Sequence, residues 1–147
     1  HIYMCGGWDG SNSLSDCNCF DCFLNGWSSM PRLDTARWGA SSATTPSGDI
    51  FVCGGLNNSM IVETQTTSVE CYRAMLGFWE QMRSMASPHT FALSVVTGDF
   101  LYVFGGKDRS RASDRAERLD LKRESWQELP HVPATLTGCS CTALQQE

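Results

Sequence analysis

The stretch Ile50-Phe51-Val52-Cys53-Gly54-Gly55 decides the fold of this chain, because a stretch of the same kind occurs three times. The other copies are IYMCGG at residues 2–7 and LYVFGG at residues 101–106. In each copy an apolar run ends in two glycines, and the copies recur at intervals of roughly 50 residues, a period typical of repeat architectures. The sequence therefore predicts a protein built from structural repeats. We expect its function to depend on the surface that the repeats form.

Further positions recur after each Gly-Gly pair, and these positions keep the same spacing relative to one another. The recurring features are a ring or Leu (Phe20, Tyr72, Leu119), then usually Asp (Asp21, Arg73, Asp120), a Trp (Trp27, Trp79, Trp126), Met or Leu three residues later (Met30, Met82, Leu129), and the start of the next segment (Arg37, His89, Leu136). A Gly-Asp pair at 48–49 and 98–99 precedes the next Gly-Gly strand. So many features in one spacing indicate true repeats.

This combination resembles the kelch repeat over essentially the whole chain. The resemblance implies an all-β fold, the β-propeller, in which each repeat supplies one four-stranded blade. Arg73, Leu119 and Leu136 depart from the kelch pattern, which puts single turns and contacts in question. The spacing predicts one kelch-repeat domain over residues 1–147, divided into a partial repeat (1–31), two repeats (37–82 and 88–130) and the start of a further repeat (136–147).

The predicted number of blades is smaller than the number that closes a propeller. The pattern predicts about three blades, whereas propellers close with roughly four to eight. We therefore expect an incomplete ring that is a fragment of a six-bladed propeller, or, as the alternative, two copies that complete one ring. Open sheet edges would invite self-association.

The strands can be assigned within each predicted blade. Clusters of β-branched and aromatic residues between turn residues indicate strands. The Gly-Gly strands are apolar throughout, as expected for strands buried on both faces. The resemblance places the small-residue stretches 39–45, 90–96 and 138–144 innermost and the Trp segments outermost. We expect each Trp to pack between neighbouring blades.

Composition limits the function classes. The chain has 147 residues, enough for one domain, and a net charge of −5 that argues against a general nucleic-acid binder. Seven of the eleven basic residues lie between Lys107 and Arg123, either as a solvated loop or as a local patch for an acidic partner. No apolar stretch reaches membrane-spanning length and no signal peptide is recognisable, so we expect a cytoplasmic protein without membrane contact.

The eight cysteines suit packing better than bridging. Cys5 and Cys53 share a repeat position with Phe104, and Cys19 and Cys71 share another with Arg118. We therefore expect reduced, mostly buried thiols. The run Cys17, Cys19, Cys22 leaves zinc binding or a redox role as alternatives, but no fourth ligand is adjacent. We expect no metal and no cofactor.

Catalytic patterns are missing from the sequence. We find no nucleophile motif, no paired carboxylates and no phosphate-binding glycine loop. We therefore expect a protein that is not an enzyme. A kelch-fold oxidase or sugar isomerase is the competing hypothesis.

The kelch resemblance implies that partners dock on the loops after Gly-Gly and on the loops that lead into the innermost strands. These predicted contact residues are, in the first set, Trp8, Asp9, Asn12, Asn57, Asn58, Lys107, Asp108, Arg109 and Arg111, and in the second set Arg37 and His89. Such polar, aromatic and cationic groups suit a peptide that carries carboxylates, because Arg binds a carboxylate with two parallel hydrogen bonds. The leading hypothesis is a protein-interaction module, by resemblance the substrate-recognition part of a cullin-type ubiquitin ligase adaptor. An actin-associated scaffold is a further alternative.

Overall fold

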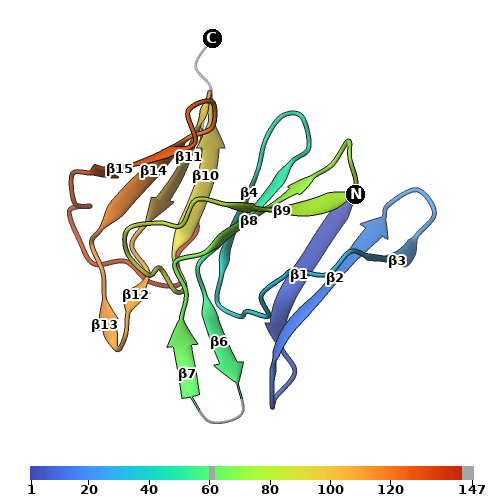
Figure 1. Cartoon of the computed structure of the whole chain (residues 1–147), viewed down its shortest axis with the longest axis horizontal. Helices are drawn as coiled ribbons and strands as arrows, with labels where there is room; N and C mark the ends of the chain where they lie inside the picture. Colours follow the sequence, from blue (N-terminus) through green and yellow to red (C-terminus); the bar gives the residue numbers. More distant parts are fainter. Residues whose placement is uncertain (60–61, 144–147) are drawn as a thin grey trace.

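The computed structural model describes residues 1–59 and 62–143, which form an all-β molecule of three larger antiparallel sheets, the blades, and two small two-stranded sheets (Figure 1). The first blade contains β1 (Ile2–Trp8), β2 (Ser13–Asp21) and β3 (Gly26–Met30). The second contains β4 (Ser41–Thr44), β5 (Ile50–Cys53), β8 (Val69–Arg73) and β9 (Phe78–Met82). The third contains β10 (Leu93–Thr97), β11 (Phe100–Phe104), β14 (Ala116–Asp120) and β15 (Ser125–Leu129). The blades confirm the predicted all-β fold of a partial propeller.

Two small hairpins lie in the loops that follow the second and third Gly-Gly pairs. They are formed by β6 (Leu56–Ser59) with β7 (Val62–Gln65) and by β12 (Lys107–Asp108) with β13 (Arg111–Ala112). Both hairpins project from the same end of the molecule, at the bottom of Figure 1. From the sequence, these segments were expected only as loops. Among the described residues, no helix is long and apolar enough to cross a membrane.

The hydrophobic core lies between neighbouring blades, and β5 contributes to both contacts. Phe51 and Cys53 pack with Leu101 and Val103 of the third blade. Val52, on the opposite face of β5, packs in a second cluster with Cys17 of the first blade. Side chains alternate across a strand, so the apolar run of β5 serves two interfaces. The prediction that a Gly-Gly strand is buried on both faces is confirmed for this blade.

Two of the three repeated Trp residues join adjacent blades. Trp79 Nε1 donates a hydrogen bond to the Pro31 carbonyl at 2.9 Å, and Trp126 Nε1 donates to the Arg83 carbonyl at 2.7 Å. Trp27 is exposed instead, on the outward side of the first blade. Trp27 therefore does not pack between blades within the described residues, because it belongs to the first of the three blades.

The turn at Arg73 shows how the chain tolerates a departure from the repeat pattern. In the third blade the Asp120 carboxylate accepts hydrogen bonds from the backbone N–H groups of the next turn. In the second blade Asp49 supplies the carboxylate, accepting from the Ala74 N–H at 3.0 Å and from the Arg73 guanidinium at 3.1 Å. The turn therefore persists because a neighbouring loop provides the missing acceptor.

The innermost strands differ from their predicted extents. Strand β4 occupies Ser41–Thr44 within the predicted 39–45, and β10 occupies Leu93–Thr97, shifted from the predicted 90–96. Residues 138–143 of the third predicted stretch belong to no sheet, and Leu144 lies outside the described residues. Among the described residues the first blade has three strands, in the order β1-β2-β3.

The second Gly-Gly pair lies in backbone contact with the next repeat. The Gly54 φ is 64° and the Gly55 φ is 96°, in the left-handed region that favours glycine. The Gly55 N–H donates to the His89 carbonyl at 3.0 Å, and a Cβ on Gly55 would lie 2.7 Å from the Trp38 carbonyl oxygen. Both glycines are therefore required by backbone contact as well as by conformation.

The cysteines are distributed between the core and the surface. Cys17, Cys53 and Cys71 are buried, and Cys5 and Cys19 are half-buried. Cys22, Cys139 and Cys141 are exposed. The expectation of mostly buried thiols is wrong, because the Asp21 turn and residues 138–143 lie at the surface. The shared repeat positions do fill space, since Cys53 and Cys71 belong to the core between the second and third blades.

Candidate functional site

The loops after the three Gly-Gly pairs gather at one end of the molecule, which we call the loop end (residues 8–12, 56–59, 62–65 and 107–112). The Asn58 N–H donates to Ser13 Oγ at 2.8 Å, which joins the first two loops. Gln65 Nε2 donates to the Lys107 carbonyl at 3.2 Å, which joins the second and third. The antiparallel strands of each blade return these loops to the same end. Within the first predicted set, the structure thus brings Asn58 and Lys107 into one surface.

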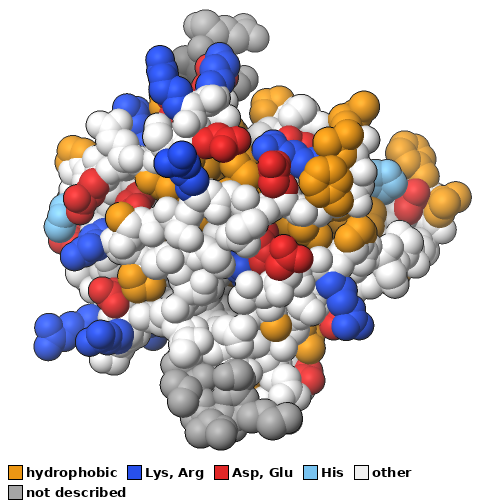
Figure 2. Space-filling view, in the orientation of Figure 1, with side chains coloured by type: hydrophobic (Ala, Val, Ile, Leu, Met, Phe, Trp, Pro, Cys, Tyr) orange, Lys and Arg blue, Asp and Glu red, His pale blue; other side chains and the backbone are white. Residues whose placement is uncertain are grey.

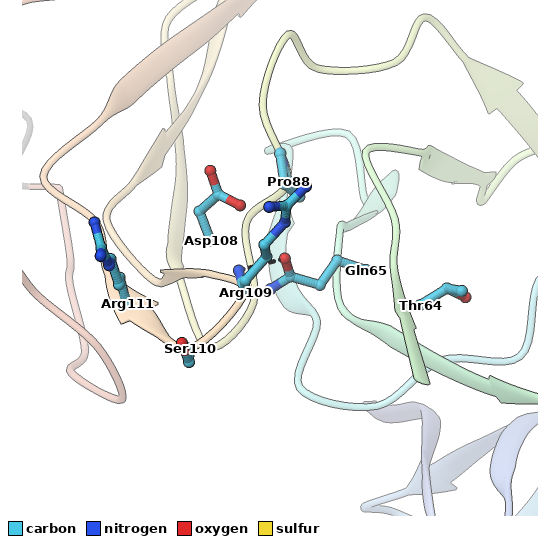
Figure 3. A pocket seen from close by; sticks show the side chains of 7 residues that line it. All are labelled: Thr64, Gln65, Pro88, Asp108, Arg109, Ser110 and Arg111. Atoms are coloured by element: carbon cyan, nitrogen blue, oxygen red, sulfur yellow. Dashed lines mark hydrogen bonds between the residues drawn. The ribbon is translucent and has the colours of Figure 1, made fainter. Parts of the chain in front are cut away.

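A groove of about 1140 Å³ opens between the two hairpins of the loop end (Figure 3). It is lined by Thr64, Gln65, Pro88, Asp108, Arg109, Ser110 and Arg111. Gln65 holds its two sides together, because its amide nitrogen also donates to Thr90 Oγ1 at 3.1 Å and its amide oxygen accepts from the Arg109 N–H. The hydrogen bonds of the Gln65 side chain therefore fix the two sides of the groove relative to each other.

The positive charges at the wall of the groove are not paired with other described side chains. Arg109 and Arg111 are exposed, and neither guanidinium makes an ion pair or hydrogen bond within residues 1–59 and 62–143. Figure 2 shows basic side chains gathered at the lower left, around the β12–β13 hairpin. Asp108 lines the same groove and is half-buried. The arrangement can bind a carboxylate, since guanidinium groups form charge-assisted hydrogen bonds with it.

An aromatic row runs across all three blades at the loop end and consists of Trp8, Trp38 and Phe91. The ring centroids of Trp8 and Trp38 are 5.7 Å apart, and those of Trp38 and Phe91 are 5.5 Å apart in an edge-on arrangement. Lys107 Nζ lies 5.6 Å from the Phe91 centroid, within the range of a cation–π contact. Trp8 is exposed, so the row offers an apolar surface at its outer end.

Asp9 and Asn12 have a local structural role in the first loop. The Asp9 carboxylate accepts hydrogen bonds from the N–H groups of Ser11 and Asn12, both at 2.7 Å. These bonds, led by that of Asn12, hold the pKa of Asp9 below its usual value. Asp9 is therefore ionised at neutral pH, and both side chains remain exposed at the loop end. Asn57 is half-buried in β6 beside Asn58.

Arg37 lies inside the protein, which corrects its assignment as a contact residue. Its guanidinium donates to the Gly54 and Ser68 carbonyls, both at 3.0 Å, and forms an ion pair with Glu70 at 2.5 Å. Neither side chain of the ion pair is exposed. Arg37 ties the start of its repeat to the Gly-Gly bend and cannot reach a partner at the surface. Removing it should lower the stability.

His89 has the corresponding position in the next repeat and is also buried. Its Nδ1 lies 2.7 Å from the Gly105 carbonyl and its Nε2 lies 3.3 Å from the Glu117 carboxylate. Glu117 accepts from the Ala86 and Ser87 N–H groups at 2.8 and 2.9 Å. Burial alone would raise the pKa of Glu117, but the hydrogen bonds, led by that from His89, hold it below its usual value. His89 is therefore a second correction to the predicted contact set.

The cysteine run in β2 is not arranged as a metal centre in the described residues. No group of three or more His, Cys, Asp or Glu side chains there is placed to hold an ion. Cys17 is directed into the core, whereas Cys22 is exposed beyond the Asp21 turn. The strand and the turn direct these thiols to different environments.

The repeat pattern did not predict a role for Gln65 in the loop end or for Trp38 and Phe91 beside it. Gln65 lies between a Gly-Gly pair and the next blade strand, where the repeats differ in length and give no alignment. Trp38 and Phe91 follow the predicted Arg37 and His89 by one and two residues. An aromatic residue one or two positions after Arg37 and His89 is the feature of the sequence that could have identified the row.

Comparison with known proteins identifies relatives across most of the chain. The family model described as the Kelch motif matches residues 88–133. The chain is 30% identical over 129 residues to beta-scruin of Limulus polyphemus, covering 86% of this chain and 14% of that protein. It is 30% identical over 107 residues to Kelch-like protein 26 of Danio rerio, covering 72% of this chain and 17% of that protein. The chain thus spans less than a fifth of the length of these curated relatives.

A solved structure has the same fold. The structure of YjhT matches with a TM-score of 0.76 at 15% sequence identity, covering 90% of this chain and 49% of that chain. At this identity the likeness concerns the fold alone.

Proposed function

Because this chain belongs to the kelch-repeat family, we propose that it is a protein-interaction module that binds carboxylate-bearing peptide segments at its loop end. The observation that carries the proposal is the groove between the two hairpins, with the guanidinium groups of Arg109 and Arg111 at its wall. Its relatives include proteins named as Kelch-like. Rigid blades with functional loops are a common arrangement for recognition.

The chemistry of the groove favours an extended acidic segment over a small neutral ligand. Two exposed cations line one wall, and the half-buried Asp108 disfavours a ligand that presents carboxylates throughout. Trp8, at the outer end of the aromatic row, can bury an apolar side chain of the same segment. The partner is therefore a protein segment with acidic residues spaced by apolar ones. Asn57 and Asn58 add amide groups beside this surface.

We further propose the substrate-recognition part of a cullin-type ubiquitin ligase adaptor as the biological role of this binding. The support is the family membership, in which proteins with the Kelch-like name occur. A complex between the full-length protein and a cullin, isolated by immunoprecipitation, would support this role. Its absence under conditions that retain the acidic partner would argue for a scaffold instead.

The binding test uses fluorescence anisotropy with labelled peptides whose charged residues are Asp and Glu, alongside peptides with Asn and Gln at the same positions. We expect the acidic peptides to bind, and the Arg109→Gln/Arg111→Gln variant to bind them at least about tenfold more weakly, since charge-assisted hydrogen bonds contribute about 1.5–3 kcal/mol. The control Lys122→Gln/Arg123→Gln removes the same charge from the β14–β15 turn, at the other end of β14.

The melting temperature should be unchanged in both double variants, because all four side chains are exposed. Equal affinity of the two variants for the acidic peptides would refute the groove as the binding site. Equal affinity of the wild-type protein for acidic and neutral peptides would refute carboxylate recognition.

A further inference from the structure

The loops after the second and third Gly-Gly pairs begin at equivalent, anchored positions. Leu56 is joined to Trp38 by two backbone hydrogen bonds of 2.8 and 2.9 Å, and Lys107 is joined to Thr90 by two of 2.7 and 3.2 Å. Leu56 and Lys107 each stand directly after the second glycine of their pair. Residues of the two loops can therefore be compared by counting from these two positions.

A side chain of the preceding loop binds the same backbone group in both of these loops. Ser13 Oγ accepts a hydrogen bond from the Asn58 N–H at 2.8 Å, and Gln65 Oε1 accepts one from the Arg109 N–H. Asn58 and Arg109 both stand two positions after the anchored residue. The contact thus occurs at both junctions between the described blades, which indicates a repeated feature of the loop end.

Gln65 makes the more extensive of the two contacts. Its Nε2 donates to the Lys107 carbonyl at 3.2 Å and to Thr90 Oγ1 at 3.1 Å, in addition to the bond that its Oε1 accepts. The carboxamide therefore binds the backbone on both sides of Asp108. A carboxamide has two N–H donors and one carbonyl oxygen, and all three are engaged here within the protein. The bonds of Gln65 indicate a residue that supports the groove.

The β12–β13 turn requires such support. Asp108 and Arg111 pair across it, which leaves Arg109 and Ser110 as a two-residue turn. The Arg109 φ is 55°, in the left-handed region that Gly and Asn adopt more readily than Arg. An isolated two-stranded hairpin is marginally stable at best. The conformation of Arg109 therefore depends on contacts from outside the hairpin, and Gln65 supplies one directly to its N–H.

The conformation of the turn determines where the Arg109 guanidinium can reach. In Figure 3 the Arg109 side chain extends from the turn in the direction of Pro88, and both residues line the groove. The side chain of Asn58, at the equivalent position, is engaged instead, because its Oδ1 accepts a hydrogen bond from Trp38 Nε1 at 3.5 Å. Of these two supported residues, Arg109 is the one that presents a charge to a ligand.

We infer that Gln65 is a positioning residue of the carboxylate site: it holds the backbone of Arg109 and thereby fixes the guanidinium at the groove. The affinity for acidic segments then depends on an uncharged side chain of the preceding repeat. This inference rests on the proposed function of the groove. A guanidinium on a fixed turn loses less conformational freedom on binding than one on a mobile turn, and this difference favours the complex.

The first test measures the affinity for the acidic peptides by fluorescence anisotropy. Gln65→Met keeps the length of the side chain and removes the carboxamide, and we expect it to bind about two- to tenfold more weakly, the effect of one hydrogen bond. The matched control Ser13→Ala removes the equivalent contact to Asn58 and should bind as the wild type does, because Arg109 keeps its support. Wild-type affinity of Gln65→Met would overturn the inference, whereas the proposed function would stand if Arg109→Gln/Arg111→Gln still binds more weakly.

Combined substitutions separate positioning from a general loosening of the loop end. Because Gln65 acts through Arg109, Gln65→Met should cause no further loss of affinity once Arg109→Gln is present. In an Arg111→Gln background, Gln65→Met should weaken binding by the same factor as in the wild type. An equal loss in the two backgrounds would show that Gln65 only stabilises the hairpin, and would overturn the inference.

Amide hydrogen exchange followed by NMR tests the contact without any peptide. The Arg109 N–H should exchange faster in Gln65→Met, and the Asn58 N–H faster in Ser13→Ala, with neither substitution affecting the other amide. Unchanged exchange of the Arg109 N–H in Gln65→Met would overturn the inference, whether or not acidic peptides bind. If exchange changes as expected but the wild type binds acidic and neutral peptides equally, the proposed function fails, and the positioning role fails with it.

Discussion

The ion pair between Arg37 and Glu70 leads to the sharpest prediction, since it is fully buried. The Glu70 carboxylate accepts from the Asp34 N–H at 2.7 Å and the Thr35 N–H at 3.2 Å as well as from Arg37. Glu70→Gln keeps the shape and one acceptor oxygen but removes the charge. Arg37 then remains as an uncompensated buried cation.

The expected loss of unfolding free energy is about 3–5 kcal/mol, because removing one partner of a buried ion pair leaves the other charge unpaired. The matched control is Glu80→Gln, whose partner Arg73 also binds Asp49 and whose side chain is 43% exposed. Partly exposed pairs contribute about 0–1 kcal/mol, so the control should change little. The two variants alter the same residue type in neighbouring strands of one blade.

Urea denaturation followed by circular dichroism measures both losses. At a slope of about 2 kcal/mol per molar urea, the Glu70→Gln midpoint should fall by about 2 M. Arg37→Met/Glu70→Gln should recover part of the loss, since the unpaired cation is gone. A Glu70→Gln loss below about 1 kcal/mol, or a double variant no more stable than Glu70→Gln, would refute the reasoning.

Three further outcomes follow from the same structure. Gly55→Val should lose over about 1 kcal/mol, because its Cβ would meet the Trp38 carbonyl, and an unchanged melting temperature would contradict this. Because the pKa of Glu117 is lowered from 4.5, its contribution is present above that pH and lost as the pH falls through the folded value; Glu117→Gln should flatten this acid limb of the stability profile. In thiol titration at pH 8, Cys53 and Cys71, whose pKa burial raises to about 12, should react only after urea is added; rapid reaction in the native protein would show an open core.

The repeat pattern made most of the fold predictable. Three Gly-Gly strands and three Trp segments identified the blades. The first glycine of each pair recurs because a Cβ there would meet the carbonyl oxygen of Arg37, His89 or Leu136. The ends of the innermost strands were less predictable. Small residues fit both an inner strand and the loop before it, so β10 begins at Leu93 and not at Thr90.

The candidate site was only partly predictable. The kelch resemblance implies that the loops after Gly-Gly lie together, so Arg109 and Arg111 could be predicted at one end of the molecule. Gln65 could not, because its role depends on the Lys107 carbonyl, 42 positions away. The roles of Arg37 and His89 were misjudged, since a charged residue near a loop is equally compatible with a surface contact and with a buried pair.

The repeat spacing made the architecture predictable, because its glycine and Trp positions resemble the kelch repeat, and the resemblance implies propeller blades. Tertiary structure alone decided which charges are available. Arg37 is buried in an ion pair with Glu70, whereas Arg109 has no such partner among the described residues. The physical reason is that pattern and spacing are local properties of the chain. Burial and charge pairing depend on what a distant segment places beside each residue.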